Sequence, residues 1–220
     1  MNERQENQRS LFQNSGYWSV HSACRLTSLV AWRLRCFGQS NFPMTGGGLI
    51  CANHQSHLDP VLIGICCPRR MNFLAKKSLF KFGPFGKFID FLDAIPLERE
   101  GIGIAGIKET IRRSRRGELV MMFPEGARTF DGEMVPLLPG TASIARRTQV
   151  PLVPVGIDGA FQAWPRTKPF PKLGKVVVCV DRPIPFSEYG SLTDEQVTEL
   201  LRERIHVRFL EARHRRGKMH

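Results

Sequence analysis

The sequence predicts an α/β fold in which helices cover a mixed, largely parallel sheet. The main observation is that short apolar runs of strand length alternate along the chain with longer segments of helical periodicity. The 220 residues suit one domain with a full core, and 42% hydrophobic and 24% charged residues are ordinary for a folded protein. We find no internal repeat and no low-complexity segment.

The N-terminal part of the chain is expected to lie outside the main domain. Residues 1–16 are polar, which predicts a disordered tail, and they lack the apolar centre of a secretory signal. Residues 17–37 have helical periodicity, with a largely apolar stripe formed by Val20, Ala23, Thr27, Val30, Leu34 and Phe37. The opposite side mixes tryptophan with arginine, which suits a membrane headgroup layer. We therefore expect an amphipathic, membrane-associating helix over 17–40, although the stripe could equally pack on the domain core.

The main domain is expected to span residues 41–212, after the Gly46–Gly48 break and before a basic tail at 213–220. Its apolar runs predict buried strands at Leu49–Ala52, Asn72–Ala75, Ala94–Leu97, Glu118–Phe123, Leu152–Ile157 and Val176–Val180. The intervening patterns predict helices at 60–67, 78–91, 103–115, 140–148 and 193–213. This order favours crossover connections and parallel strands.

Charge and cysteine content restrict the partners and the compartment. The 32 basic residues exceed the 20 acidic ones, and the net charge of +12 attracts nucleic acid, anionic lipid or phosphorylated small molecules. No apolar run approaches the roughly 18 residues of a spanning helix, so we expect any membrane contact to be peripheral. Six cysteines without a CxxC pair are interpreted as buried apolar residues in a reducing compartment.

The strongest local signal is the segment Asn53–Pro60 (NHQSHLDP), which directly follows a predicted strand. Ligands of α/β proteins bind beyond the carboxyl ends of strands, where His54 is expected. On one ideal helix His54 and Asp59 would point about 140° apart. They can meet if His54 ends the strand and Asp59 opens the helix, and Pro60 suits a first helical turn. An imidazole held by a carboxylate is suited to act as a general base.

Other interpretations of this segment remain open. Ser56 and Asp59 have the spacing of a helix capping box. His54, His57 and Asp59 could bind a metal, but their spacing differs from known zinc motifs, so we expect no metal and interpret His57 as structural. The sequence has no GxSxG nucleophile motif, so the base is expected to activate a hydroxyl of the substrate.

A second group of polar residues follows the predicted strand Glu118–Phe123. Gly126 permits a tight turn, and the planar guanidinium of Arg128 is suited to phosphate. Glu125 could orient Arg128 or accept a hydrogen bond from a substrate hydroxyl, although a solvated ion pair is the simpler alternative. At the same expected edge, Arg99 could contact phosphate and Lys76 adds positive charge.

Together these segments resemble the lysophospholipid and glycerol-phosphate acyltransferase family, which includes bacterial 1-acylglycerol-3-phosphate acyltransferases. The family's NHxxxxD motif matches Asn53, His54 and Asp59, and its FPEGxRS motif matches Phe123–Gly126 and Arg128, with Thr129 in place of serine. Two weaker motifs match Ile95–Arg99, which lacks the usual aromatic residue, and Val150–Pro154. The resemblance covers roughly residues 45–160.

The resemblance implies direct acyl transfer without an acyl-enzyme. His54 would take the proton of the acceptor hydroxyl, and Asp59 would orient His54. Arg99 and Arg128 would hold the acceptor phosphate in a pocket shaped by Glu125. The donor would be an acyl-CoA or acyl carrier protein thioester, with no cofactor.

The expected acceptor is the lysophospholipid 1-acyl-sn-glycerol 3-phosphate, giving phosphatidic acid, with another lysolipid or glycerol 3-phosphate as alternatives. The resemblance also implies peripheral attachment to an anionic membrane surface, on its cytoplasmic face, and no nucleic acid partner. The residues alone leave two other classes open: a metal-dependent hydrolase, and a non-enzymatic basic module that binds membrane or nucleic acid.

Overall fold

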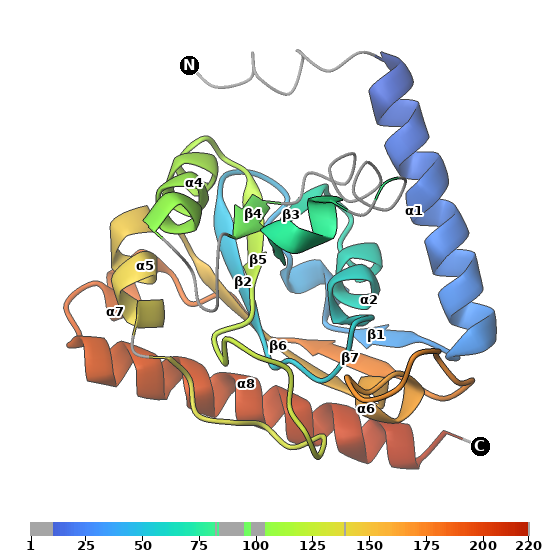
Figure 1. Ribbon diagram of the computed structural model, residues 1–220. Helices are drawn as coiled ribbons and strands as arrows, with labels where there is room; N and C mark the ends of the chain where they lie inside the picture. The colour runs from blue at the N-terminus through green and yellow to red at the C-terminus, as the bar shows by residue number, and fades with distance from the viewer. Residues whose placement is uncertain (1–10, 82, 84–94, 98–103, 139, 220) are drawn as a thin grey trace.

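The computed structural model describes residues 11–81, 83, 95–97, 104–138 and 140–219. The predicted α/β class is confirmed by a seven-stranded sheet in the order β1-β7-β6-β2-β5-β3-β4 (Figure 1). The strands are β1 Arg35–Phe37, β2 Gly48–Ala52, β3 Met71–Lys76, β4 Ile95–Leu97, β5 Leu119–Met122, β6 Leu152–Asp158 and β7 Val177–Val180. Only the β6–β7 pairing is antiparallel among these strands.

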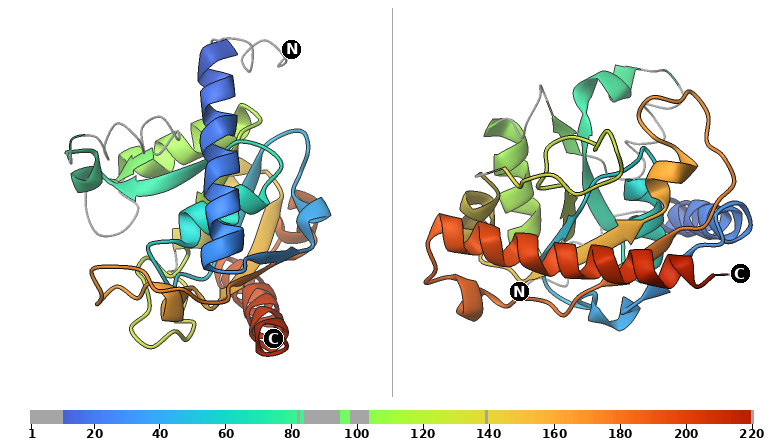
Figure 2. Two further views of the ribbon diagram at one scale, coloured as in Figure 1. Left: turned by 90° about the vertical axis from the view of Figure 1, so that its right-hand side faces the viewer. Right: turned by 90° about the horizontal axis from the view of Figure 1, so that it is seen from below.

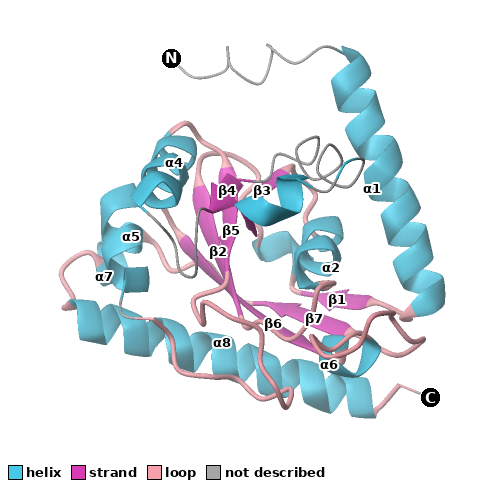
Figure 3. Ribbon diagram, viewed as in Figure 1, coloured by secondary structure: helices cyan, strands magenta, loops and turns pink. Residues whose placement is uncertain are grey.

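Helices cover both faces of this sheet (Figure 3). The α-helices are α1 Leu11–Ala31, α2 Asp59–Cys66, α4 Ile104–Arg115, α5 Gly140–Thr148, α6 Ala160–Ala163, α7 Phe186–Tyr189 and α8 Asp194–Gly217. Two short 3-10 helices are η2 Gln39–Asn41 and η3 Lys77–Lys81. Most of the predicted helix 78–91 lies outside the described residues.

The core consists of two main apolar layers, one on each face of the sheet. Strand β2 shows how they divide, because successive side chains of a strand point to opposite faces. Ile50 and Ala52 pack in the layer that contains α2, whereas Leu49 and Cys51 pack in the layer that contains α5 and α8. All five residues of β2 are buried, which explains why the strand reads as a continuous apolar run.

Helix α8 lies across the sheet beneath β6 and β7 (Figure 2, right). Thr193 begins it with a capping box, and an apolar stripe faces the sheet: Val197, Leu201, Ile205, Phe209 and Ala212. Gly156 permits close approach, because a Cβ there would lie 2.1 Å from the backbone nitrogen of Phe209. The prediction of a basic tail at 213–220 is wrong as far as Gly217, since Arg213 and Arg216 continue the helix and pair with buried Asp158.

The N-terminal helix differs from the prediction at both ends. It begins at Leu11, inside the segment 1–16 expected to be disordered, and ends at Ala31. Arg33 has a left-handed backbone (φ 44°), which stops helical propagation. The chain then forms the edge strand β1, which pairs with β7, so the helical expectation through residue 37 is wrong.

The orientation of α1 also differs from the expected stripe. Tyr17 and Ser28 are buried, and His21 and Cys24 on the same face are half-buried. Val30, a member of the predicted stripe, is 76% exposed. Helix α1 packs against α2 at one side of the molecule (Figure 2, left). Within the described segments, no helix has both the length and the apolar character needed to cross a bilayer.

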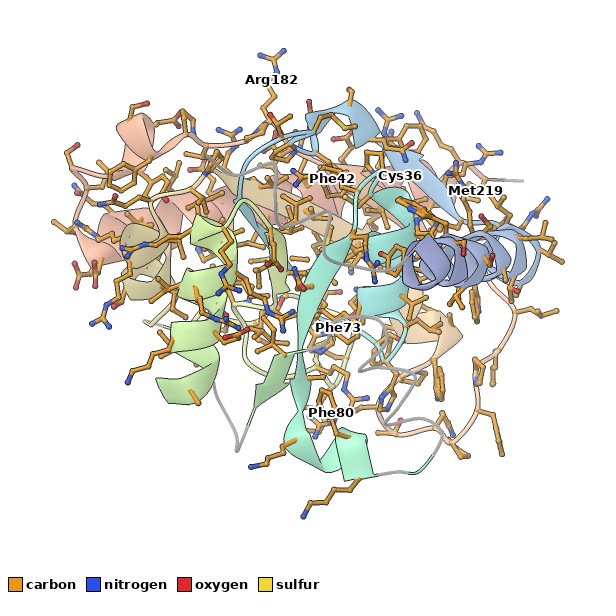
Figure 4. All side chains as sticks on the ribbon, turned by 90° about the horizontal axis from the view of Figure 1, so that it is seen from above. Cys36, Phe42, Phe73, Phe80, Arg182 and Met219 are labelled. Atoms are coloured by element: carbon orange, nitrogen blue, oxygen red, sulfur yellow. The ribbon has the colours of Figure 1, made fainter. Side chains whose placement is uncertain are left out.

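The cysteine side chains are buried or half-buried, in agreement with their interpretation as apolar residues. All six cysteines are free thiols, four of them buried and two half-buried. Nitrogen-tipped side chains surround the outline of the molecule, and Arg182 projects into open space from the loop after β7 (Figure 4).

Candidate active site

The two segments with the strongest sequence signals meet at one edge of the sheet. Strands β2 and β5 are parallel neighbours, with Gly48 opposite Leu119 and Cys51 opposite Met122. Because parallel strands end at the same edge, Asn53–Pro60 after β2 and Phe123–Thr129 after β5 start side by side.

The structure brings His54 and Asp59 into direct contact. The His54 Nδ1 atom lies 2.8 Å from Asp59 Oδ2, and Asp59 is the first residue of α2. The same oxygen accepts the backbone N–H groups of Gln55 at 2.6 Å and Ser56 at 2.7 Å. The Asp59 side chain is fully buried, whereas the His54 side chain is 17% exposed. A carboxylate at Nδ1 leaves Nε2 as the proton-accepting nitrogen.

Asp59 therefore holds the turn before α2 and does not complete a capping box with Ser56. Helix α2 has no side-chain cap, since its N-cap position is occupied by Leu58. Ser56 Oγ instead accepts the Leu58 N–H at 3.1 Å and donates to the Trp164 carbonyl at 2.7 Å. The turn is thus joined to the loop that follows α6.

The segment after β5 surrounds His54. The His54 N–H donates to Glu125 Oε1 at 3.2 Å, and the His54 carbonyl accepts the Thr129 N–H at 2.9 Å. The imidazole stacks on the Phe123 ring, with centroids 3.9 Å apart and planes 13° apart. Neither this stacking nor the Glu125 contact could be predicted from the sequence, because both depend on β2 and β5 being neighbours.

Asn53 fixes the turn from the other side. Its Nδ2 donates to the Ile157 carbonyl at 3.0 Å, and its Oδ1 accepts the Ile157 N–H at 2.8 Å. The side chain is buried, so both bonds are made out of contact with water. Gln55 adds a bond from Nε2 to the Gly132 carbonyl at 2.6 Å. These bonds hold His54 between β6 and the segment after β5.

Glu125 is an unusual carboxyl group. It is 5% exposed, and its Oε2 is buried without a hydrogen-bond partner. Burial raises the pKa of Glu125 to about 8, although hydrogen bonds from the backbone of His54 and Val135 oppose the shift. The carboxyl is therefore mainly protonated at neutral pH. Among the described residues no ion pair joins Glu125 to Arg128, so no direct contact supports the alternative in which Glu125 orients Arg128.

Gly126 and Arg128 form the turn beyond Glu125. Gly126 has φ 72°, and a Cβ there would lie 2.4 Å from a methyl carbon of Leu138. Arg128 is half-buried, and its Nη1 is buried without a partner. Burial and the nearby charge of Arg166 lower the pKa of Arg128. The Arg128 guanidinium, whose Nη1 has no partner among the described residues, thus lies near enough to Asp59 and His57 to interact with them electrostatically.

The remaining predicted residues have no contact with His54 or Arg128 that the described part of the structure shows. Lys76 ends β3, at the same edge of the sheet, and Arg99 lies outside the described residues. His57 is exposed, with its ring tilted against Trp164 at a centroid distance of 5.2 Å. Among the described side chains, no three histidine, cysteine or acidic groups converge as metal ligands.

A mostly apolar pocket lies on the His54 side of the sheet, between α1 and α2. Its lining consists of Tyr17, Val20, His21, Cys24, Pro60, Val61, Gly64, Ile65, Met71, Phe73 and Met121. Met121 is two residues before Phe123, which stacks on His54. The pocket and the histidine therefore lie along the same face of β5.

A family model described as Acyltransferase matches residues 33–158, more than half of the chain. The chain belongs to the acyltransferase family. This match includes the His54–Asp59 pair, Phe123–Thr129 and the Val150–Pro154 segment.

The chain is also similar to individual acyltransferases in sequence and in structure. The 1-acyl-sn-glycerol-3-phosphate acyltransferase of Bacillus subtilis is 31% identical over 177 residues, covering 78% of this chain and 86% of that protein. The human 1-acyl-sn-glycerol-3-phosphate acyltransferase beta is 31% identical over 142 residues, covering 63% of this chain, which spans about half (51%) of the human protein. The crystal structure of the 1-acyl-sn-glycerophosphate acyltransferase PlsC from Thermotoga maritima has the same fold, with a TM-score of 0.80, 23% identity and coverage of 100% and 86%.

Proposed function

We propose that this acyltransferase moves a fatty acyl group from a thioester to the free hydroxyl of 1-acyl-sn-glycerol 3-phosphate, giving phosphatidic acid. The observation that carries the proposal is the His54–Asp59 pair, with the partner-free Nη1 of Arg128 on the adjoining segment. The names of the Bacillus and human relatives point to the same acceptor.

In the proposed reaction His54 acts as a general base and then as a general acid. Its Nε2 takes the proton of the acceptor hydroxyl, and Asp59 stabilises the imidazolium that forms. The hydroxyl oxygen attacks the thioester carbonyl, and the resulting tetrahedral intermediate expels the thiolate. The thiolate takes the proton from His54, so the products are the new ester and a free thiol.

The neighbouring residues bind and position. Arg128 holds the acceptor phosphate through its free N–H groups. Neutral Glu125 accepts the His54 N–H and keeps a second charge away from Asp59. Arg99 is proposed as a further contact of the acceptor phosphate, and Lys76, the last residue of β3, as an additional positive charge. The donor is an acyl-CoA or an acyl carrier protein thioester, and no cofactor takes part.

The apolar pocket between α1 and α2 is proposed to hold an acyl chain. Its lining includes Gly64 of α2, where an added Cβ would meet no atom within 4 Å. A side chain added at this position would therefore begin in open space at the pocket lining. Helix α1 forms one wall of this pocket. An acyl chain bound in the pocket would therefore contact the N-terminal helix.

The exposed face of α1 is proposed to contact the membrane surface from the cytoplasmic side. This face carries four exposed apolar side chains: Trp18 (40%), Leu26 (65%), Leu29 (48%) and Val30 (76%). An apolar helix face can insert at the boundary between the headgroups and the acyl chains of a membrane. The net charge of +12 adds electrostatic attraction to anionic lipids. The enzyme would then take its lipid acceptor directly from the surface on which it lies.

A thiol-release assay tests the proposed reaction. Detergent-dispersed lysophosphatidate, glycerol 3-phosphate and an uncharged monoacylglycerol are each combined with acyl-CoA and with acyl carrier protein thioester. We expect fastest thiol release with lysophosphatidate and none above background with His54→Ala. Absence of release by the unaltered protein with every pair would refute acyl transfer.

A further inference from the structure

Arg166, in the loop after α6, lies beside Arg128 although it belongs to none of the sequence motifs. Its Nη1 donates to the Arg128 carbonyl at 3.2 Å. Its guanidinium carbon lies 4.1 Å from the centroid of the Phe130 ring, which is itself 74% exposed. Arg166 therefore stands at the rim of the site, over the segment that carries Arg128.

The loop that carries Arg166 is tied to the catalytic turn. The Trp164 carbonyl accepts the Ser56 hydroxyl at 2.7 Å, and the Trp164 indole N–H donates to the Lys168 carbonyl at 2.9 Å. The Trp164 ring also contacts the His57 ring. Arg166, two residues after Trp164, is thereby held near the segment Asn53–Pro60.

Among the described residues, no carboxylate forms an ion pair with Arg166 or with its neighbour Arg128. All six arginines of α8 lie within 4.0 Å of a carboxylate: Arg202, Arg204, Arg208, Arg213, Arg215 and Arg216. Among the residues that the structure describes, neither Arg128 nor Arg166 forms such a pair. The two guanidinium groups repel each other, and both lower the pKa of the nearby His57. Two neighbouring cations that form no ion pair with a described carboxylate are an arrangement that a bound anion stabilises.

We propose that Arg166 is a second ligand of the acceptor phosphate, which it binds from the rim while Arg128 binds it from within the site. A phosphate monoester offers three oxygens, enough for two guanidinium groups. The stacking on Phe130 leaves the edge N–H groups of Arg166 available in the plane of the guanidinium. This assignment rests on the proposed function, because it concerns the acceptor of the same reaction.

Equilibrium binding without a donor tests the assignment, because no transfer occurs. The probe is a short-chain soluble lysophosphatidate, compared with the phosphate-free monoacylglycerol of equal chain length. We expect Arg166→Ala to weaken lysophosphatidate binding about 10- to 100-fold, as for loss of a charged hydrogen bond, and to leave monoacylglycerol binding unchanged. The matched control is Lys168→Ala, which removes an exposed cation from the same loop and is expected to change neither affinity by more than about twofold.

Two further variants separate phosphate binding from a structural role. Arg166→Lys keeps the charge but not the planar fork, so it should retain part of the affinity. Arg128→Ala and Arg166→Ala should combine non-additively, because both groups bind one phosphate. Equal weakening of both ligands by Arg166→Ala, or equal effects of Arg166→Ala and Lys168→Ala, would overturn the assignment.

The proposed reaction has its own readout. If the unaltered protein releases thiol with lysophosphatidate but Arg166→Ala binds it normally, the reaction stands and the role of Arg166 falls. If the unaltered protein binds lysophosphatidate no better than monoacylglycerol, both arginine assignments fall, whatever the thiol assay shows.

Discussion

Replacing Glu125 with glutamine should make the stability of the protein less sensitive to pH. Burial raises the pKa of Glu125 from 4.5 to about 8, so the folded state holds this proton more tightly than the unfolded state. The stabilising effect is complete below the unfolded pKa and is lost as the pH rises towards the folded pKa. A shift of this size corresponds to at most about 5 kcal/mol, of which about 2 kcal/mol is lost between about pH 6 and about pH 8.

Glutamine keeps the oxygen that accepts the His54 N–H but has no proton to lose. In urea unfolding, the free energy of unfolding of the unaltered protein should therefore fall by about 2 kcal/mol between about pH 6 and about pH 8. The free energy of unfolding of Glu125→Gln should not show this decrease. Glu203→Gln, at an exposed position on α8, is the matched control and should keep the full loss. Equal pH dependence in Glu125→Gln and the unaltered protein would show that the carboxyl ionises normally.

Substitutions at three other positions test the His54–Asp59 pair, the apolar pocket and the hydrogen bonds of Asn53. Asp59→Asn should lower kcat in the thiol assay by on the order of 10³ with little change in KM, because the imidazolium loses its counter-charge. Gly64→Leu should shift the preferred acyl-CoA to a shorter chain, while Gly64→Ala should mainly raise the unfolding free energy by about 0.5–1 kcal/mol. Asn53→Ala should cost about 2–4 kcal/mol in urea unfolding, because both backbone groups of Ile157 lose buried partners. An unchanged kcat in Asp59→Asn would contradict the role of Asp59. An unchanged chain preference in Gly64→Leu would contradict acyl binding in the pocket, and an unchanged stability in Asn53→Ala would contradict the role of the Asn53 hydrogen bonds.

The sequence predicted best those features that depend on local pattern. The run Leu49–Ala52 is apolar throughout because β2 is buried on both faces. Pro60 indicated that α2 begins near Asp59, and this start brings Asp59 to His54. The contact between His54 and Asp59 could therefore be predicted from the spacing of the motif.

Features that depend on distant contacts could not be predicted in this way. Strand β1 has three residues and pairs with β7, far along the chain, so nothing local marks it as a strand. The direction in which α1 faces follows from its packing on α2, which a periodic stripe does not specify. Arg166 looks like an ordinary exposed arginine until the Ser56–Trp164 bond brings its loop to the site.

One face of helix α1 lines the pocket, and its other face is exposed. Negative charge placed on the exposed face should therefore weaken membrane binding without lowering the rate of acyl transfer. Leu26 and Val30 are exposed, so Leu26→Glu with Val30→Glu should leave the fold and the pocket wall intact. Removing two apolar contacts should weaken binding to anionic vesicles by at least about tenfold, measured by co-sedimentation. Thiol release with short-chain soluble substrates should persist. The matched control is Val207→Glu with Leu210→Glu on α8, which also removes two exposed apolar side chains, from the opposite face of the sheet. If this control lost vesicle binding to the same extent, the added negative charge would explain the effect and α1 would have no special part in it.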